Sequence, residues 1–483
     1  MKKGLTVVIK LGTSSIVDEH THQPLLSILS LIVETAVNLR KDGYHVVIVS
    51  SGAIGTALRM MDLDRRPKHL PKVQALAAIG QCRLMSLWDQ LFSHFRQPVA
   101  QILLTRNDIA DRTQYLNAQN TFIELLSMGV IPIVNENDTL SVQEIKFGDN
   151  DTLSAITAGM VQADYLFLMT DVDCLYDTNP RKNPDAKPIE VVEDIGTLTA
   201  DTSSAGSSLG TGGMSTKIVA ARLATSAGVM TVITKSSKPG NIRSIVRYVE
   251  ASKVTISSSL VSPTPPQQHQ PEIQSEVPLP IRQDAQTAQP TTSTAISPSP
   301  SSSQTLPPQP PAQTLQHPPL HTRFLPSPHP IRDRYFWLLH GLAPHGTIYI
   351  DSGAHRALAD KAGLLPAGVV DVEGNFAQHE AVRIVVIAKK VAVVGNAVTS
   401  SPTNGAGKDG SGNGSGSGTT TPAPVEVGRA LVNYSAAEIR RIKGHRSTEI
   451  HDVLGYADSE YVALRENIAF LALGSSRPGT PGI

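Results

Sequence analysis

The sequence has few cysteines, few aromatic side chains and no excess of charge of either sign. Its 483 residues include two cysteines and 4% aromatics, and Lys plus Arg number 42, as do Asp plus Glu. Cys82 and Cys174 lack metal-type spacing, which excludes a disulfide scaffold and indicates a reduced intracellular protein. The balanced charge excludes a protein coated in basic side chains for non-specific nucleic-acid binding.

Long hydrophobic runs are also missing. A membrane-spanning helix needs about 20 mostly apolar residues, and no run in the chain approaches this length. The apolar run near the N-terminus, residues 7–9, is too short for the core of a signal peptide. These absences predict a cytoplasmic protein with no membrane partner. The length leaves room for two domains and linkers.

One dense polar stretch stands out against this background. Residues 135–151 read NENDTLSVQEIKFGDND and follow an apolar run at 130–134 that is typical of a buried parallel strand. The stretch contains carboxylates, amides and one lysine. In an open α/β sheet, ligands bind beyond the carboxyl ends of the strands, so we expect a binding site here. A solvated turn is the alternative for this stretch alone, because Asn, Asp and Gly form turns.

Strands and helices alternate through the first half of the chain. Apolar runs predict strands at 6–9, 46–49, 99–104, 130–134 and 165–169, with helical patterns between them. This alternation predicts an α/β fold with an open, mostly parallel sheet flanked by helices.

Three segments are suited to phosphate, and the first two of them follow predicted strands. Lys10 lies in KLGTS, and Ser51 lies in SSGA at the start of a helix. The segment GTGGMSTK, ending at Lys217, combines glycines, hydroxyls and a cation at a helix start, although its spacing is not that of a Walker A loop. A surface lysine or a glycine-rich hinge is the alternative for each segment by itself.

Two tracts of low complexity divide the chain. Residues 257–321 are rich in Pro, Ser and Gln and contain too little apolar surface to offset chain entropy, which predicts a disordered insertion. Residues 399–424 are rich in Gly and Ser and predict a flexible loop. The predicted domains are 1–256, completed by an edge strand at 322–326, and a small, mainly β unit at 337–475.

Five spaced motifs carry a family resemblance. VIKLGTS, IVSSGAIG, NENDTLSVQEIKFGDND, LMTDVDCLYDTNPR and GTGGMSTK, in this order, resemble the glutamate 5-kinases of the amino-acid kinase family. The C-terminal segments GTIYIDSGAHRAL, VDVEGNF and IKGHRSTEI resemble the PUA domain joined to many of those kinases. The KLGTS form and the PUA domain favour glutamate over other substrates. The two low-complexity tracts depart from the pattern of bacterial members.

The resemblance implies a specific reaction. ATP, with Mg²⁺, would phosphorylate the γ-carboxylate of L-glutamate in the first step of proline synthesis, with proline as feedback inhibitor. A carboxylate is already ionised at neutral pH, so the chemistry needs positioning and cationic charge rather than a general base. The resemblance also implies a homo-oligomer and transfer of the labile product to γ-glutamyl phosphate reductase.

The motif matches also imply roles for individual residues. Lys10 and Lys217 are expected to clamp the transferred phosphoryl group, and Asp149 is expected to orient the two lysines. Ser51, Asp138 and Asn150 are expected to hold glutamate. The residues expected at the nucleotide are Lys10, Thr170, Asp171, Thr211, Gly212, Gly213, Met214, Ser215, Thr216 and Lys217. The motifs do not indicate which carboxylate binds Mg²⁺.

Two alternatives remain open. One is an RNA-binding protein that acts through the PUA domain, in which Arg440, Arg441, Lys443 and Arg446 form a basic cluster. A solvated helix face explains this cluster as well and is favoured. The other is an amino-acid kinase that acts on another small acid or on a phosphate.

Overall fold

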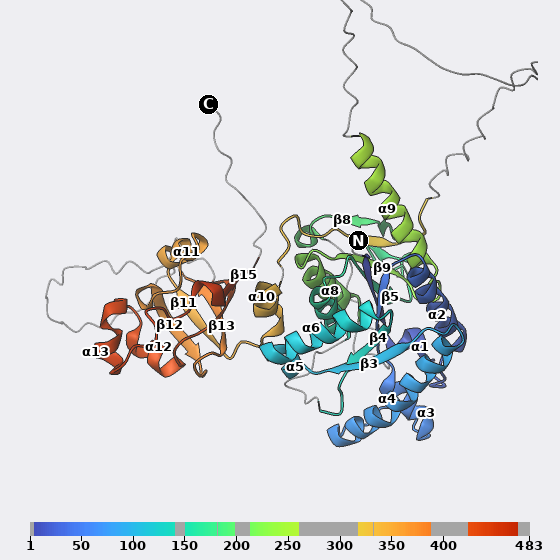
Figure 1. The fold of residues 1–483 in the computed structure, drawn as a ribbon, viewed down its shortest axis with the longest axis horizontal. Coiled ribbons are helices and arrows are strands. Elements are labelled where there is room, and N and C mark those ends of the chain that lie inside the picture. The colour runs from blue at the N-terminus through green and yellow to red at the C-terminus, as the bar shows by residue number, and fades with distance from the viewer. Residues whose placement is uncertain are drawn as a thin grey trace, which may run out of the picture. The chain divides into compact units, whose positions relative to one another are not determined.

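An eight-stranded sheet forms the centre of the first half of the chain in the computed structural model (Figure 1). The strand order is β3-β4-β2-β1-β5-β9-β10-β8, and every pairing is parallel except that of β10 with β9. The strands are β1 (Thr6–Leu11), β2 (His45–Ser50), β3 (Val99–Leu104), β4 (Ile131–Glu136), β5 (Tyr165–Thr170), β8 (Val191–Val192), β9 (Met230–Lys235) and β10 (Thr322–Phe324). The predicted mostly parallel sheet is confirmed.

The structure describes residues 4–140, 150–180, 182–198, 213–259, 317–331, 333–387 and 424–471. They belong to two units, Met1–Arg243 with Pro319–Ile483, and Ser244–Pro318. The predicted low-complexity tracts, 257–321 and 399–424, lie almost entirely outside the described residues. Across the described ranges, no helix combines the length and the apolar character needed to cross a membrane.

Strand β1 shows why these sequences form buried parallel strands. All six of its residues, TVVIKL, are buried, and it pairs with β2 on one side and β5 on the other. A parallel strand covered on both faces reads as a continuous apolar run rather than an alternating one. Neighbouring side chains still point to opposite faces, so Val8 and Ile9 contribute to different packing layers.

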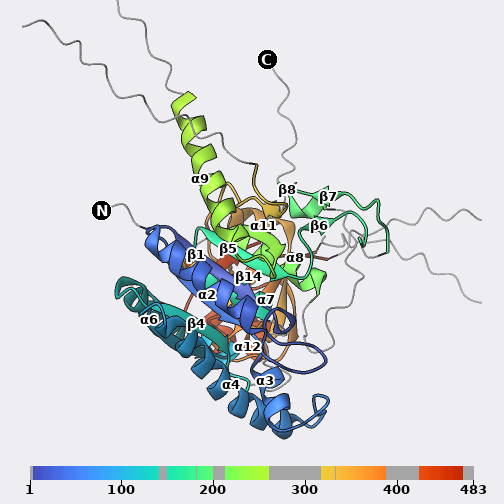
Figure 2. The same cartoon turned by 90° about the vertical axis from the view of Figure 1, so that its right-hand side faces the viewer.

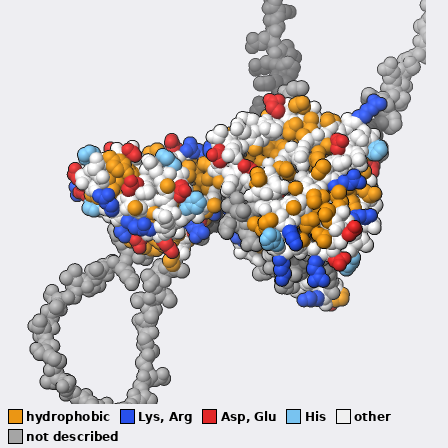
Figure 3. All heavy atoms as spheres, turned by 90° about the horizontal axis from the view of Figure 1, so that it is seen from below, with side chains coloured by type: hydrophobic (Ala, Val, Ile, Leu, Met, Phe, Trp, Pro, Cys, Tyr) orange, Lys and Arg blue, Asp and Glu red, His pale blue; other side chains and the backbone are white. Residues whose placement is uncertain are grey.

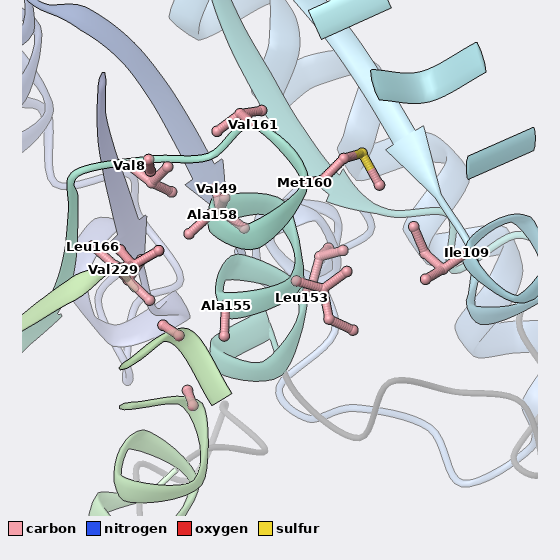
Figure 4. Close-up of a cluster of buried hydrophobic side chains, with 14 of the residues drawn as sticks. Val8, Val49, Ile109, Leu153, Ala155, Ala158, Met160, Val161, Leu166 and Val229 are labelled. Carbon is pink, nitrogen blue, oxygen red and sulfur yellow. The ribbon is translucent and has the colours of Figure 1, made fainter. Parts of the chain in front are cut away.

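Helices flank the sheet (Figure 2). Figure 4 shows Leu153, Ala155 and Ala158 of α7 (Asn150–Met160) beside Val8 of β1 and Val49 of β2, within the larger core cluster. The other helices are α1 (Thr13–Ile16), α2 (Leu26–Lys41), α3 (Ala53–Met60), α4 (Leu70–Ser93), α5 (Arg106–Ala110), α6 (Arg112–Ser127), α8 (Met214–Ser226) and α9 (Asn241–Ser259). Small residues on α7 let the helix approach the sheet closely.

A second sheet lies in the C-terminal part of the chain and forms the centre of a mainly β unit. Its order is β12-β11-β13-β14-β15, formed by β11 (Gly346–Ile350), β12 (Val369–Gly374), β13 (Ala381–Val386), β14 (Val425–Leu431) and β15 (Ile468–Phe470). Three short helices accompany it: α11 (Ser352–Ala359), α12 (Ala436–Ile442) and α13 (Ile450–Leu454). Its buried cluster, which includes Ile348, Ile384 and Ile439, is separate from the core of the first sheet. The predicted small β domain is confirmed.

A short helical segment connects the two sheets along the chain. Helix α10 (Asp333–Phe336) continues into a π-helical turn, Trp337–Gly341. The indole N–H of Trp337 donates to the carbonyl of Ile109 at 2.9 Å, and the guanidinium of Arg112 lies 5.1 Å from the Trp337 ring. The Trp337 side chain therefore holds this segment against α5 and α6.

The structure corrects one detail of the predicted sheet. The sequence predicts that 322–326 forms an edge strand, whereas β10 lies between β9 and β8. Strand β8 forms the edge instead, and it pairs with β10 through Val191 and Val192. A strand of two residues carries no recognisable periodicity, which is why the sequence does not reveal it.

Candidate active site

Two lysines from separate elements meet one buried carboxylate at the carboxyl edge of the sheet. Lys10 lies near the end of β1, Asp151 in the first turn of α7 and Lys217 in the first turn of α8. Lys10 Nζ lies 2.5 Å from Asp151 Oδ1, and Lys217 Nζ lies 3.3 Å from Asp151 Oδ2. The Asp151 side chain is 0% exposed. The predicted lysines are thus brought together at the edge where such sheets bind ligands.

The charge state of Asp151 follows from its surroundings. Burial alone would raise the pKa of this carboxyl, but the ammonium groups of Lys10 and Lys217 outweigh burial and lower the pKa to about 2. Asp151 is therefore a permanent anion at neutral pH. A buried ion stays stable only when it is paired and hydrogen-bonded, so the three side chains hold one another in place.

Thr216 ties the start of α8 to the same carboxylate. Its Oγ1 lies 2.7 Å from Asp151 Oδ2 and accepts a hydrogen bond from the Gly213 N–H at 3.0 Å. The residues Gly213 to Lys217 thus form the start of helix α8 next to the buried carboxylate, and helix starts are sites that attract phosphate. Thr211 and Gly212, also predicted at the nucleotide, lie outside the described residues.

A chain of amides and hydroxyls lies at the ends of β2 and β4. Asn135 Oδ1 accepts from its neighbour's backbone, the Glu136 N–H, at 2.9 Å, and from Asn150 Nδ2 at 3.0 Å. Asn135 Nδ2 donates to Gln81 Oε1 at 2.8 Å. Asn150 Nδ2 also donates to Ser51 Oγ at 2.8 Å. The structure therefore brings together two of the three residues predicted to hold glutamate, Ser51 and Asn150.

Three further predicted residues, Asp138, Thr170 and Asp171, lie beyond or at the ends of β4 and β5. Asp138 is half-buried, two residues beyond the end of β4. Thr170 ends β5, and its Oγ1 donates to Asp171 Oδ1 at 3.1 Å. Lys235, at the end of β9, pairs with Asp173 at 3.1 Å. Polar and charged groups thus follow β4 and β5, as the sequence predicts, and a charged pair is also found at the end of β9.

Sequence reasoning passed over two residues that the structure places in the site. Asp149 lies outside the described residues, so its assignment stays a prediction, whereas Asp151 is seen between the two lysines. The signal for Asp151 was its place one turn before the apolar Leu153 and Ala155, which buries the start of the helix. Gln81 has no comparable signal, because an amide within a long helix usually faces solvent.

The described residues contain no group of three or more His, Cys, Asp or Glu side chains placed to hold a metal ion. The ionisable groups of the site are instead arranged as cations around a carboxylate. Such an arrangement is suited to an anionic ligand rather than to a resident metal.

Comparisons with known proteins agree with this geometry. The model of the amino acid kinase family matches residues 5–236, and that of the PUA domain matches residues 346–403. A "probable glutamate 5-kinase" of Schizosaccharomyces pombe is 48% identical over 98% of this chain and 95% of its own length. An uncharacterised protein of Saccharomyces cerevisiae is 44% identical over 97% of this chain and 99% of its own length. A glutamate 5-kinase of Synechococcus is 39% identical over 96% and 98%.

Solved structures include more distant matches. The carbamate kinase of Giardia lamblia bound to AMP-PNP is 19% identical, covers 50% of this chain and 95% of that one, and aligns with a TM-score of 0.37. The UMP kinase of Ureaplasma parvum is 16% identical, covers 51% and 95%, and aligns at 0.35. Scores this low add nothing to the assignment.

The fold and site define a kinase built on an open parallel sheet. The chain belongs to the amino acid kinase family, with a PUA domain at its C-terminal side. The resemblance seen in the five sequence motifs is confirmed.

Proposed function

We propose that the chain transfers the γ-phosphoryl group of ATP to the γ-carboxylate of L-glutamate. The convergence of Lys10 and Lys217 on Asp151 is the observation that carries the proposal. Transfer between a carboxylate and a phosphate brings two anions together, and preorganised cations lower that barrier. The names of the similar proteins support glutamate as the acceptor.

The positions of the side chains suggest how each reactant would be held. The N-terminal turn of α8 would receive the phosphates, and Thr170 and Asp171 would border the nucleotide. Lys10 and Lys217 would contact the transferred group from two sides. Asp151 would fix both ammonium groups in place, so little rearrangement is needed when the reaction occurs.

Mg²⁺ fits this site as an ion that enters with the nucleotide. Protein sites commonly hold Mg²⁺ through one or two carboxylates and the substrate phosphates, without a dedicated cage. Asp151 is already engaged by two lysines and Asp173 by Lys235, so Asp171, directly after the end of β5, is the better placed carboxylate. When bound, Mg²⁺ would neutralise part of the phosphate charge.

Glutamate would bind where the ends of β2 and β4 meet. Ser51, Asn150 and Asp138 would hold the α-carboxylate and α-ammonium groups, leaving the γ-carboxylate directed at the lysines. An alcohol acceptor would need a base to take up its proton, whereas the carboxylate is already ionised at neutral pH. The site therefore favours an acidic amino acid over an alcohol.

A substrate panel tests the proposal. ADP release is measured with L-glutamate, L-aspartate and N-acetyl-L-glutamate, each with ATP and Mg²⁺. We expect turnover with glutamate to exceed that with the other two by at least tenfold in kcat/KM. Preference for aspartate or N-acetylglutamate would assign the same catalytic apparatus to another small acid.

Several further properties are inferred from the resemblance. We infer that proline inhibits the enzyme, that γ-glutamyl phosphate reductase receives the product and that the protein is cytoplasmic. Hydrophobic side chains gather on the visible face of the part of the chain that contains the eight-stranded sheet (Figure 3). The exposed apolar residues of the chain include Leu116, Ile123 and Met128. Such exposed apolar side chains support a homo-oligomer.

RNA binding by the PUA domain is the second candidate, favoured by the match to that domain. The basic cluster gives it limited support. Lys443 pairs with Asp371 at 2.7 Å, and Arg440 and Arg441 donate to the carbonyls of Gly374 and Val453. Charged side chains of both signs are mixed on the visible face of this domain (Figure 3). Salt-dependent RNA retention by the full chain would support the RNA function, and its absence at about 50 mM salt would exclude it.

A further inference from the structure

We infer that Gln81 is a positioning residue that, together with the Glu136 N–H, holds the Asn135 amide in one orientation. This orientation determines where the substrate site receives the α-ammonium group and the α-carboxylate of an amino acid. The inference rests on the proposed function, because it concerns how the same site orients its acceptor. Gln81 lies on α4, outside every motif that carries the family resemblance.

Hydrogen bonds to the backbone fix the direction of the amide chain. The Glu136 N–H can only donate, so the atom of Asn135 that faces it must be the acceptor Oδ1. The other end of the amide, Nδ2, then faces Gln81 and requires an acceptor there, which Oε1 provides at 2.8 Å. Asn135 is 3% exposed, so water does not replace that acceptor readily.

The fixed Asn135 in turn decides the orientation of Asn150. Because Asn135 Oδ1 is an acceptor, Asn150 must present Nδ2 to it. Asn150 Nδ2 gives its second hydrogen to Ser51 Oγ, so both of its hydrogens are used. What remains of this amide is Oδ1, which is buried with no hydrogen-bond partner in the described structure.

This polarity matches an α-amino acid in one orientation. The buried Asn150 Oδ1 accepts from the α-ammonium group, since an acceptor left unpaired in a buried site is costly. Ser51 Oγ already accepts from Asn150, so its own O–H donates to the α-carboxylate. If the Asn135 amide were rotated by half a turn, Asn150 would present a donor to the substrate and Ser51 an acceptor. The Glu136 N–H and Gln81 together hold the observed arrangement, and Gln81 acts on the amino acid only through Asn135.

The test compares glutamate with glutarate, the same dicarboxylic acid without the amino group. Gln81→Met keeps the side-chain length but removes the acceptor for Asn135. We expect it to reduce the preference for glutamate over glutarate, in kcat/KM, about tenfold, with the ATP KM unchanged. Gln90→Met, the same substitution at an exposed position of α4, is the control and should keep the wild-type preference.

Gln81→Glu supplies a second, independent test. Its carboxylate still accepts from Asn135 Nδ2, and its added negative charge opposes the doubly charged glutarate more than glutamate. The preference for glutamate should therefore persist in this variant. Two results would overturn the inference if the wild-type enzyme phosphorylates glutamate. One is loss of the preference for glutamate in Gln81→Glu, and the other is an unchanged preference in folded Gln81→Met. A wild-type protein that does not phosphorylate glutamate would overturn the proposed function and this inference together.

Discussion

Lys10 Nζ and Asp151 Oδ1 lie 2.5 Å apart, with 4% and 0% of their side chains exposed. The pair joins the end of a central strand to the start of a helix, and Lys217, from a second helix, also contacts Asp151. In this account, Asp151 keeps two cations at the place where phosphoryl transfer requires them.

Asp151→Asn should reduce kcat at least about a hundredfold, the scale of losing a preorganised charge interaction. The amide keeps the shape but leaves two buried ammonium groups without this counter-charge, so the melting temperature should fall as well. Steady-state kinetics and thermal unfolding measure the two effects. The control is Asp42→Asn, which removes a carboxylate paired with Arg243 at 2.6 Å near the protein surface. Normal turnover by folded Asp151→Asn would contradict the role.

The stability of the wild-type protein should depend on pH through the same carboxyl. The pKa of Asp151 is about 2 in the folded protein, against an ordinary value of 3.8 for an aspartic acid. Its contribution is therefore complete above about pH 4 and is lost as the pH falls toward 2. The difference in melting temperature between wild type and Asp151→Asn should be constant from pH 7 to about 4 and shrink below it. A difference that shrank between pH 7 and 5 would assign the effect to another group.

Asp138→Asn should weaken glutamate and proline together. Both ligands carry an α-ammonium group, and loss of a charge-assisted hydrogen bond costs roughly 1.5–3 kcal/mol, or about tenfold to a hundredfold. We expect the glutamate KM and the proline inhibition constant to rise in parallel, with the ATP KM little changed. If proline inhibition disappeared while the glutamate KM stayed the same, proline would bind at a separate site.

His340 should make the connecting segment sensitive to acid. Burial, followed by the charge of Arg429, lowers the pKa of His340 from 6.5 to about 3, and its Nε2 has no hydrogen-bond partner among the residues that the structure describes. The unfolded chain thus binds a proton below pH 6.5 that the folded chain does not, so stability falls as the pH drops from about 6.5 toward 3. The slope should approach about 1.4 kcal/mol per pH unit between about pH 5.5 and pH 4.

His340→Met tests this dependence. Methionine fills the buried space without a titratable or unsatisfied nitrogen, so this part of the acid sensitivity should disappear. Denaturant unfolding at pH 7, 6 and 5 measures it. Parallel losses of stability in wild type and His340→Met would show that His340 does not titrate on unfolding.

The sequence predicts the sheet well because buried parallel strands are unmistakable apolar runs. Residues 6–11 and 165–170 are examples, each nearly all buried. The convergence of Lys10 and Lys217 also follows from sequence, since both come at element boundaries that meet at one sheet edge. The choice between Asp149 and Asp151 requires the rotation of α7 about its axis, which two acidic positions separated by one residue do not reveal.

Other features depend on contacts between distant parts of the chain. Gln81 meets Asn135 across 54 residues, and no local pattern distinguishes it from a solvent-facing amide on the same helix. Strand β8 exists because β10 provides a partner, although the two are far apart in sequence. Tertiary packing, not local propensity, determines both.

Trapping the acyl phosphate product shows directly whether the γ-carboxylate of glutamate receives the phosphoryl group. The full chain is incubated with ATP, Mg²⁺, L-glutamate and hydroxylamine, which converts an acyl phosphate into a hydroxamate. The account predicts the γ-hydroxamate of glutamate, formed in proportion to ADP by the wild type and almost absent with Asp151→Asn. ADP release without hydroxamate, or formation of the α-hydroxamate, would contradict transfer to the γ-carboxylate at the Lys10–Asp151–Lys217 site.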